Sequence, residues 1–400
     1  MQTSRIWTAL AVVVVAIGSS SCQIGGASLT STSLAPGEVA TTGAPSAESV
    51  PPASTSSSRA PQTKPPLDGI IDMGVQTPYL QHQPFPTIDL SPLDAYAGAF
   101  AGVVVNEGWS QLEPKQGVYY WAPLKRSLAA VSVWNAQHSS TPVGVKLRVF
   151  AGYSAPSWVT SQSGVVTEVV HGVSVEMGRW WTPVYEAAWK TFQWALASAF
   201  DTDPLIRQVS VSSCSSSTGE PFVVSGALVS QRDLRAVGWS VGAQVACLKN
   251  ALKDYANWRE TPVTFAMNAL YDPATPGHPD VSVLDAIARE CARSGATGGP
   301  TCILGNNDLS PTLASTVLSG PLITEIQSLI SQGLRPLVYF QTNGTRLSCS
   351  TIDAGLSYHA RSIEVWSPRD GYPGFTVVPP AVLGQWNRAL QSQSSSVPCP

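Results

Sequence analysis

The sequence carries little charge. Lys, Arg, Asp and Glu make up 12% of its 400 residues, about half the share usual in globular proteins, and the formal net charge is −3. No basic stripe runs along the chain, which argues against nucleic acid as a partner. The five His are scattered and no pair of Cys has C-x-x-C spacing, so no structural zinc site and no cofactor are expected. Carboxylates alone could still hold a metal.

Long hydrophobic runs are also missing. The apolar run at residues 6–17 follows Arg5 and is too short to cross a bilayer, which is typical of a signal peptide. Small residues lead from it to Cys22, and this ending resembles a bacterial lipobox, in which the cysteine is acylated after cleavage. Ser19 replaces the usual aliphatic residue, so lipidation of Cys22, plain secretion and an uncleaved anchor all stay open. We expect residues 1–22 to be a signal peptide with a lipobox-like end.

Aromatic and charged residues are almost absent from residues 23–66, which consist mainly of Ser, Thr, Ala, Pro and Gly. Such a composition cannot bury enough apolar surface to offset the entropy lost on ordering. We therefore expect a disordered linker that lifts a domain off the membrane. The remaining residues, 67–400, have the usual length for one (β/α)8 barrel, and we expect it to be a monomer.

Seven cysteines favour an oxidising location outside the cytoplasm. If Cys22 carries a lipid, six remain, and six allow fifteen pairings among which the sequence does not choose. The simplest pairs are Cys291 with Cys302, across a Gly-rich turn, and Cys349 with Cys399, which would pin the C-terminus. We expect an exported protein, either anchored to the cell membrane through Cys22 and facing outside, or secreted.

One pattern repeats after residue 67: a short β-branched run, a polar loop and then helix-like sequence. Eight such runs occur, at residues 70–75, 102–107, 143–150, 206–213, 262–268, 302–306, 336–341 and 362–366. Strands that alternate with helices form a parallel sheet, and eight of them close into a barrel. The sequence therefore predicts an α/β protein, a (β/α)8 TIM barrel preceded by the signal peptide and the linker.

Polar side chains alternate with apolar ones along several of these strands. Lys146 and Arg148 alternate with Val145 and Leu147, and Glu364 lies inside an apolar strand. In an open doubly wound sheet both strand faces are apolar, so the alternation favours a barrel. Unpaired polar groups inside it would cost several kcal/mol each. We expect them either to line a wet or ligand-filled mouth or to form a polar network near the barrel floor.

Active sites of (β/α)8 barrels lie at the C-terminal ends of the strands. These ends carry carboxylates, amides, one Arg and indoles, and such groups bind sugars, because polar groups pair with hydroxyls and indoles stack on the ring face. The candidate substrate-binding residues are Asn106, Glu107, Trp109, Arg148, Trp158, Asn268, Tyr271, Gln341 and Trp366.

Residues 105–121 resemble the segment after the second strand in retaining (β/α)8 glycoside hydrolases, and family 42 β-galactosidases carry a similar W-x-x-L-E-P-x-x-G-x-Y. Residues 146–148 and 155–158 are similar to the third strand and its loop in those enzymes. The resemblance covers most of residues 67–390 in layout. It implies a sugar-cleaving enzyme in which Glu220, past the fourth strand, is the acid/base.

Two features depart from these families. Gly219 precedes Glu220 where the families usually have Asn, and the seventh strand ends in Gln341 where they keep the nucleophile Glu. The nearest inward carboxylate is Glu364, on the eighth strand. Glu364 has therefore taken the second role, the barrel uses another mechanism, or it no longer cleaves.

We predict an exported glycoside hydrolase-like protein that acts on a carbohydrate by acid/base catalysis with two carboxylates, Glu220 and Glu364. Glu220 would be kept protonated by a partly apolar setting near Phe222, and Glu107 is a rival for the second carboxylate. The alternative is a non-catalytic glycan-binding barrel at the cell surface, which Gln341 favours, and a cell-wall scaffold is a third possibility.

Residues 238–242 match G-x-S-x-G, the nucleophile elbow of α/β-hydrolases. That motif needs a strand before it, whereas residues 231–236 read as the start of a helix. We do not expect a serine hydrolase.

Overall fold

The computed structural model describes residues 63–74, 84–170, 173–216, 218–221, 233–268, 282–313, 320–334, 336–343, 347–368, 373–397 and 399. The expected signal peptide, Cys22, most of the expected linker and Tyr271 lie outside the described residues, so these assignments stay predictions. Among the residues that are described, no helix has both the length and the hydrophobicity needed to cross a membrane.

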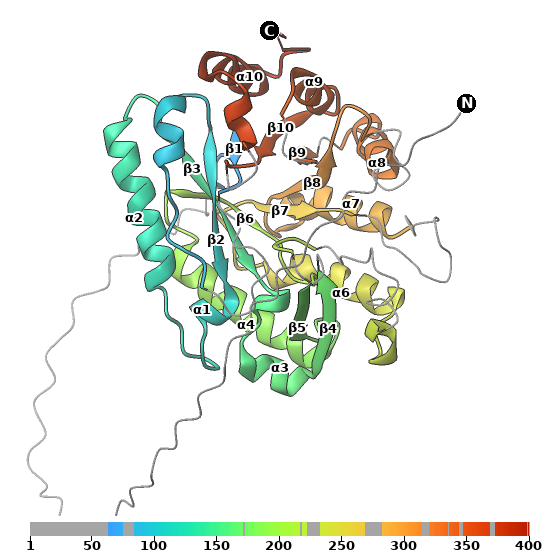
Figure 1. Ribbon diagram of the computed structural model, residues 1–400. Coiled ribbons are helices and arrows are strands. Elements are labelled where there is room, and N and C mark those ends of the chain that lie inside the picture. The colour runs from blue at the N-terminus through green and yellow to red at the C-terminus, as the bar shows by residue number, and fades with distance from the viewer. Residues whose placement is uncertain are drawn as a thin grey trace, which may run out of the picture. The chain divides into compact units, whose positions relative to one another are not determined.

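Eight parallel strands close into a barrel in the order β1-β10-β9-β8-β7-β6-β3-β2 (Figure 1). Each of them overlaps one of the eight predicted strands, so the predicted (β/α)8 barrel is confirmed. The strands are β1 (Gly69–Asp72), β2 (Gly102–Gly108), β3 (Gly144–Phe150), β6 (Ile206–Ser210), β7 (Val263–Ala266), β8 (Cys302–Leu309), β9 (Leu337–Thr342) and β10 (Ala360–Val365).

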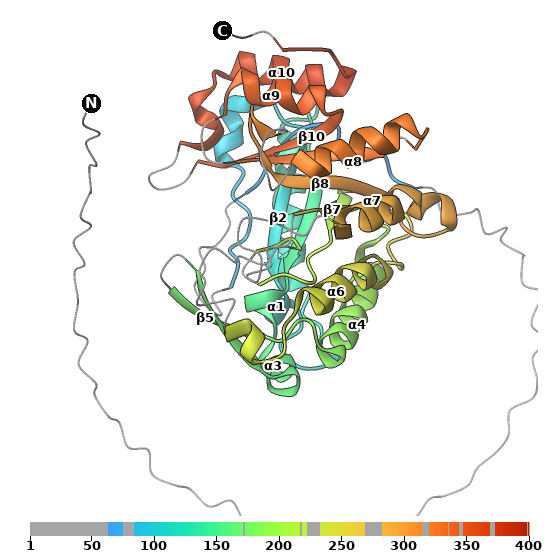
Figure 2. The ribbon, with the colours of Figure 1, turned by 90° about the vertical axis from the view of Figure 1, so that its right-hand side faces the viewer.

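Helices follow the strands and surround the barrel (Figures 1 and 2). The long ones are α2 (Ala122–Gln137), α4 (Pro183–Phe200), α6 (Val241–Asp254), α7 (Ser282–Ser294), α8 (Gly320–Ser331), α9 (Cys349–Ser357) and α10 (Pro380–Ser392). Shorter helical segments are α1 (Trp109–Leu112), α3 (Ser157–Ser163), η1 (Ser91–Tyr96), η2 (Gly152–Ser154), η3 (Gly295–Thr297) and η5 (Gly374–Val377).

Helix α4 shows how the sequence determines where these helices start and which face they bury. Pro183 occupies its first turn, where the missing N–H costs nothing. Tyr185, Trp189, Phe192 and Leu196 recur at three- and four-residue spacing and are all buried. The apolar stripe that results packs the helix against the outside of the barrel.

An antiparallel hairpin of β4 (Val165–Val170) and β5 (Val173–Gly178) interrupts the alternation between β3 and α4. The sequence prediction missed it. Val166 and Glu168 are buried while Val165 and Thr167 are exposed, a period of two that is typical of a half-buried strand. In Figure 1 the hairpin lies toward the same end of the barrel as α1, which directly follows β2.

Strand register decides which side chains face the barrel interior. Residues paired across neighbouring strands point to the same side, and successive residues of a strand point to opposite sides. Lys146 pairs with Val104 on β2 and with Gln208 on β6, and these residues face inward. Val145 and Leu147 face outward and join the core that the helices cover.

The barrel floor holds part of the expected linker. The Lys64 ammonium donates to the carbonyl oxygens of Asp203 at 2.6 Å and Ile206 at 3.0 Å, and Arg207 donates to the carbonyl of Pro65 at 2.7 Å. The residues predicted as linker up to Pro66 are therefore not all disordered. Composition alone missed this because one lysine gains several buried acceptors only in the folded barrel.

Three disulfides connect the described residues. Cys291–Cys302 joins α7 to β8, and Cys349–Cys399 joins the start of α9 to the C-terminus; both pairs were predicted. Cys214–Cys247 joins the segment after β6 to α6. This third bond fixes the beginning of the segment that leads to Glu220.

The ring of Tyr339 on β9 fills the interior beside Gly305 on β8, its partner in the sheet. A Cβ at Gly305 would lie 1.9 Å from Cε1 of that ring. Only glycine therefore allows the tyrosine to lie across the barrel.

Gly305→Ala is expected to lower the free energy of unfolding by about 1–3 kcal/mol, because the ring of Tyr339 must move in a close-packed interior. Chemical denaturation measures the loss. Gly384→Ala on α10 is the matched control, since the nearest atom to its new Cβ is the end of Arg388 at 3.6 Å. Equal stability of the two variants would contradict the packing of Tyr339 over Gly305.

Candidate active site

Two cations and two carboxylates meet inside the barrel. Lys146 and Arg148 come from β3, Glu364 comes from β10, and Glu220 comes from the segment after β6. None of the four side chains is more than 3% exposed. We call these four residues the charge cluster; its formal charges sum to zero.

The two carboxylates share the same donors. Arg148 Nη2 donates to Glu220 Oε1 at 2.9 Å and to Glu364 Oε2 at 2.5 Å. Lys146 Nζ lies 3.4 Å from Glu220 Oε1 and also donates to Glu364 Oε1. The predicted pair of carboxylates therefore lies side by side, and Arg148, predicted as a sugar contact, bridges it.

Tyr339 completes the cluster. Its hydroxyl donates to Glu220 Oε1 at 3.1 Å, and Lys146 Nζ lies 3.9 Å from the centre of its ring. The sequence prediction named neither Tyr339 nor Lys146 as a site residue. For Lys146 a signal existed, since it lies two residues before Arg148 and so shares its strand face; Tyr339 is indistinguishable from an apolar strand residue.

The charge state of Glu220 follows from its neighbours. Burial alone would raise the pKa of its carboxyl, but Arg148 and Lys146 outweigh burial and hold the pKa at about 2. Glu220 is therefore ionised at neutral pH. The prediction that an apolar setting keeps it protonated is wrong, because that prediction did not place two cations beside it.

Four further candidates lie at the C-terminal ends of the strands. Gln341 pairs with Glu364 and so faces inward beside it. Asn106 pairs with Arg148, and its amide donates to the carbonyl of Met73 at 3.0 Å.

The other two follow β7 and β10. Asn268 is half-buried, with its side-chain oxygen 3.4 Å from the amide nitrogen of Asn306. Trp366 is half-buried, and its ring nitrogen donates to the carbonyl of Thr342 at 2.9 Å.

Glu107 does not lie with the charge cluster. Glu107 lies on the outward face of β2, where it pairs with Val149 on β3. Ser127 on α2 donates to its carboxyl at 3.4 Å. Asn106 and Glu107 are consecutive, so only one of them can face the interior. This position contradicts Glu107 as the second carboxylate.

The two tryptophans of the resemblance are packing residues. Trp109 is fully buried against Trp189 on α4, and its ring nitrogen donates to Glu113 at 2.8 Å. Trp158 donates to the carbonyl of Glu113 at 3.3 Å and meets the ring of Trp109 edge-on. Glu113 also accepts from the backbone N–H of Gly117 at 2.9 Å. The W-x-x-L-E-P segment thus builds a turn that closes the outer core.

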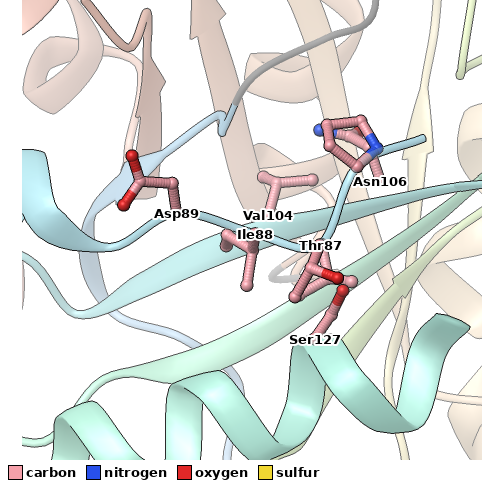
Figure 3. A pocket seen from close by; sticks show the side chains of 8 residues that line it. Thr87, Ile88, Asp89, Val104, Asn106 and Ser127 are labelled. Atoms are coloured by element: carbon pink, nitrogen blue, oxygen red, sulfur yellow. The ribbon is translucent and has the colours of Figure 1, made fainter.

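A separate cavity of about 100 Å³ lies between β2, α2 and residues 86–89 (Figure 3). The hydroxyl of Ser127 borders it from α2, and Thr87 and Asp89 border it from the other side. It includes no member of the charge cluster. We therefore place the candidate site inside the barrel and not at this cavity.

Ser240, the serine of G-x-S-x-G, is the N-cap of α6, and its hydroxyl accepts from the backbone N–H of Ala243 at 3.1 Å. Residues 233–236 are helical, so no strand directly precedes the motif. The elbow interpretation is excluded, as expected. Among the described residues no three His, Cys, Asp or Glu side chains are grouped to hold a metal ion.

No protein-family model matches the sequence, and no curated protein matches it. Among solved structures, the chain is similar to endo-glycoceramidase II from Rhodococcus sp., with 15% identity over 77% of this chain and 75% of that chain and a TM-score of 0.46. It is also similar to an endo-β-1,4-glucanase from Xanthomonas axonopodis pv. citri, with 11% identity over 80% and 99% and a TM-score of 0.44. Both neighbours are glycoside hydrolases. Similarity of this size carries no argument about function, and the resemblance to family 42 stays a prediction.

Lys146→Met is expected to cost about 3–5 kcal/mol of unfolding free energy at pH 7, because it leaves Glu364 and Glu220 with one cation between them. Urea denaturation checks this value. Lys115→Met is the control, since Lys115 is exposed and its removal should change stability by less than about 0.5 kcal/mol. A loss no larger than in the control would mean that Lys146 does not balance the carboxylates.

Glu107 predicts a pH dependence. Burial raises its pKa from 4.5 to about 8, although Ser127 acts in the opposite direction. Between these two pH values the unfolded chain has lost a proton that the folded protein keeps. The free energy of unfolding should therefore fall as pH rises through this window, by up to about 1.4 kcal/mol per unit.

Glu107→Gln should make this slope shallower by up to about 1.4 kcal/mol per pH unit, which denaturation at a series of pH values measures. Glu290→Gln, at an exposed position of α7, should leave it unchanged. Glu220 acts in the opposite sense: its stabilising contribution is present above pH 4.5 and is lost as pH falls toward about 2. An unchanged slope in Glu107→Gln would contradict a protonated Glu107 in the folded protein.

Proposed function

We propose that this chain is an exported glycoside hydrolase-like protein that acts on a carbohydrate with Glu220 and Glu364 as its two carboxylates. One observation carries the proposal: two glutamates from distant parts of the chain meet on the same guanidinium nitrogen inside the barrel. The strands bring them together at the end where (β/α)8 enzymes have their active sites.

The carboxylate separation favours retention of configuration. Arg148 Nη2 lies 2.9 Å from Glu220 Oε1 and 2.5 Å from Glu364 Oε2. The distance between these two carboxyl oxygens therefore cannot exceed the sum of those two distances. Retaining enzymes hold their carboxyl groups about 5–5.5 Å apart, and inverting enzymes about 6.5–9.5 Å. At the shorter spacing there is no room for a water molecule between the two carboxyl groups.

The contacts of Glu220 support one assignment of the two roles. Arg148, Lys146 and Tyr339 all approach Oε1 of Glu220, so Oε2 of this ionised carboxylate is left for a substrate. Glu220 is thus the better nucleophile, which reverses the role expected from the sequence.

In this assignment Glu220 Oε2 attacks the anomeric carbon, and the glycosidic C–O bond breaks as Glu364 donates a proton to the leaving oxygen. Water then gives its proton to Glu364 and its oxygen to the anomeric carbon, which releases Glu220. Gln341 beside Glu364, together with Asn268 and Trp366, supplies sugar contacts.

A second function, glycan binding without cleavage, is favoured by one observation. Both oxygens of Glu364 are already engaged, one by Lys146 and one by Arg148. Both oxygens therefore accept from a cation, whereas a general acid must present a proton to the leaving oxygen. Gln341 in place of a strand-seven glutamate points in the same direction.

The location is proposed with the function. Lipid attachment at Cys22, or secretion, would place the barrel outside the cell. Lys64 and Pro65 lie at the barrel floor, opposite the strand ends that carry the charge cluster.

Aryl β- and α-glycosides and cell-wall polysaccharides test the proposal. Turnover is expected in the wild type, and Glu364→Gln should lower kcat by about 10²–10⁴-fold. Glu220→Ala should abolish turnover, and azide should restore it with a glycosyl azide of inverted configuration as the product. Glu176→Gln, on the exposed face of the hairpin, is the control.

Turnover retained in Glu220→Ala without azide would end the role of Glu220. Saturable binding of a glycan by the wild type, with no sugar released, would overturn hydrolysis and support the glycan-binding function.

A further inference from the structure

The hairpin β4–β5 buries a glutamate that the proposed chemistry does not use. Glu168 has 0% exposure, and it lies on the inner face of the hairpin with Val166, Val175 and Met177, none of them more than 4% exposed. Glu176 lies on the outer face and is exposed. An acidic side chain in such an apolar setting needs a reason, because burying its charge is costly.

Among the described residues, no cation forms an ion pair with Glu168. Neither carboxyl oxygen has a close hydrogen-bond partner among the described residues. Burial raises the pKa of Glu168 to about 7, and the side chain of Ser216 acts in the opposite direction. Glu168 is therefore uncharged in mildly acidic solution.

The elements packed against the hairpin carry few titratable groups. Helix η2 presents Tyr153, α3 has none, and α4 presents Tyr185, whose ring packs against Gly178 on β5. Arg179 follows β5 directly, and its guanidinium donates to the carbonyl of Val165 at 3.4 Å. Within the described part of the chain, ionised Glu168 would thus be a buried charge without a cation to compensate it.

Ser216 lies near this carboxyl without a hydrogen bond to it at normal geometry, and the chain leads from Ser216 to Glu220. Its hydroxyl acts on Glu168, and its carbonyl accepts from the backbone N–H of Tyr153 on η2 at 3.1 Å. Gly152 packs so closely on Ser216 that a Cβ there would lie 1.5 Å from that carbonyl oxygen. Cys214, two residues before Ser216, is fixed to α6 by its disulfide. Ser216 is thus held between the barrel and the hairpin, four residues before Glu220.

We infer that Glu168 is a positioning residue whose buried carboxyl keeps the hairpin β4–β5 docked on η2 and Ser216 and so fixes the segment that carries Glu220. The inference rests on the role of Glu220 in the proposed function. Ionisation of Glu168 undocks the hairpin, so the site is held in place in acid and is released as the solution approaches neutrality.

The direction of the pH dependence follows from the difference in the pKa of Glu168 between the docked and the undocked hairpin. An undocked Glu168 titrates near the ordinary 4.5 and a docked one near 7. Between these values each pH unit raises the equilibrium constant for undocking by up to about tenfold, and above the docked value the increase stops.

Amide hydrogen exchange of the full chain, corrected for the intrinsic pH dependence of exchange, tests this. In the wild type, protection of the hairpin, of η2 and of residues 212–216 should fall by up to about tenfold per unit from pH 5 to 7 and then level off. Glu168→Gln should remove the slope, because glutamine keeps the shape and cannot ionise. Glu176→Gln, the matched change on the outer face, should keep it.

Ser216→Ala gives a second, independent readout. Since Ser216 lowers the pKa of Glu168, its removal should extend the falling phase to higher pH. A wild-type slope in Glu168→Gln, or no upward extension in Ser216→Ala, would overturn the inference. Exchange needs no substrate, so a failure to cleave glycosides would overturn the proposed function and leave the exchange result as it stands.

Discussion

The barrel depends on a balance of four buried charges. Lys146 and Arg148 on β3 face Glu364 and Glu220, and none of the four side chains is more than 3% exposed. Each ion alone would cost several kcal/mol to bury, and the cluster is tolerable only because every charge has two opposite neighbours. Glu220 arrives from the segment after β6, so this segment must close over the barrel before the cations are satisfied. The need for neutrality thus fixes the position of Glu220.

The period of two along the strands made most of this architecture predictable. Eight β-branched runs predicted eight strands, and the alternation in β3 predicted that Lys146 and Arg148 share a face. Glu364 lies between the apolar residues Ile363 and Val365 and faces inward as predicted, where it contacts Arg148. These inferences succeeded because side-chain direction in a strand depends on sequence position alone.

Side-chain roles were less predictable where they depend on three-dimensional neighbours. Trp109 and Trp158 have the right residue type for a sugar platform, but the turn around Glu113 directs both into the core. Glu107 directly follows Asn106 on β2. Consecutive strand residues point to opposite sides of the sheet, so only one of the two can face the barrel interior. The charge of Glu220 was not predicted, because the sequence does not show that both Lys146 and Arg148 reach its carboxyl. The hairpin β4–β5 was missed although apolar and polar residues alternate in its sequence. A (β/α)8 barrel usually has a helix after the third strand, so no further strands were expected there.

The buried carboxyl groups of this fold fall into two classes whose pKa values shift in opposite directions. The classes differ in whether the carboxyl contacts the cations of β3. Inside the barrel, Arg148 and Lys146 overcome burial and keep Glu220 ionised. Outside it, Glu107 and Glu168 form no ion pair with a described residue, and burial raises the pKa of each well above 4.5. Desolvation acts on all three carboxyls, and the main difference is the contact of Glu220 with the two cations of β3. A chain in which β3 carried apolar residues at positions 146 and 148 would hold Glu220 protonated, as the sequence prediction assumed. The charge state of Glu220 is therefore set mainly on β3, by residues far from it in the sequence.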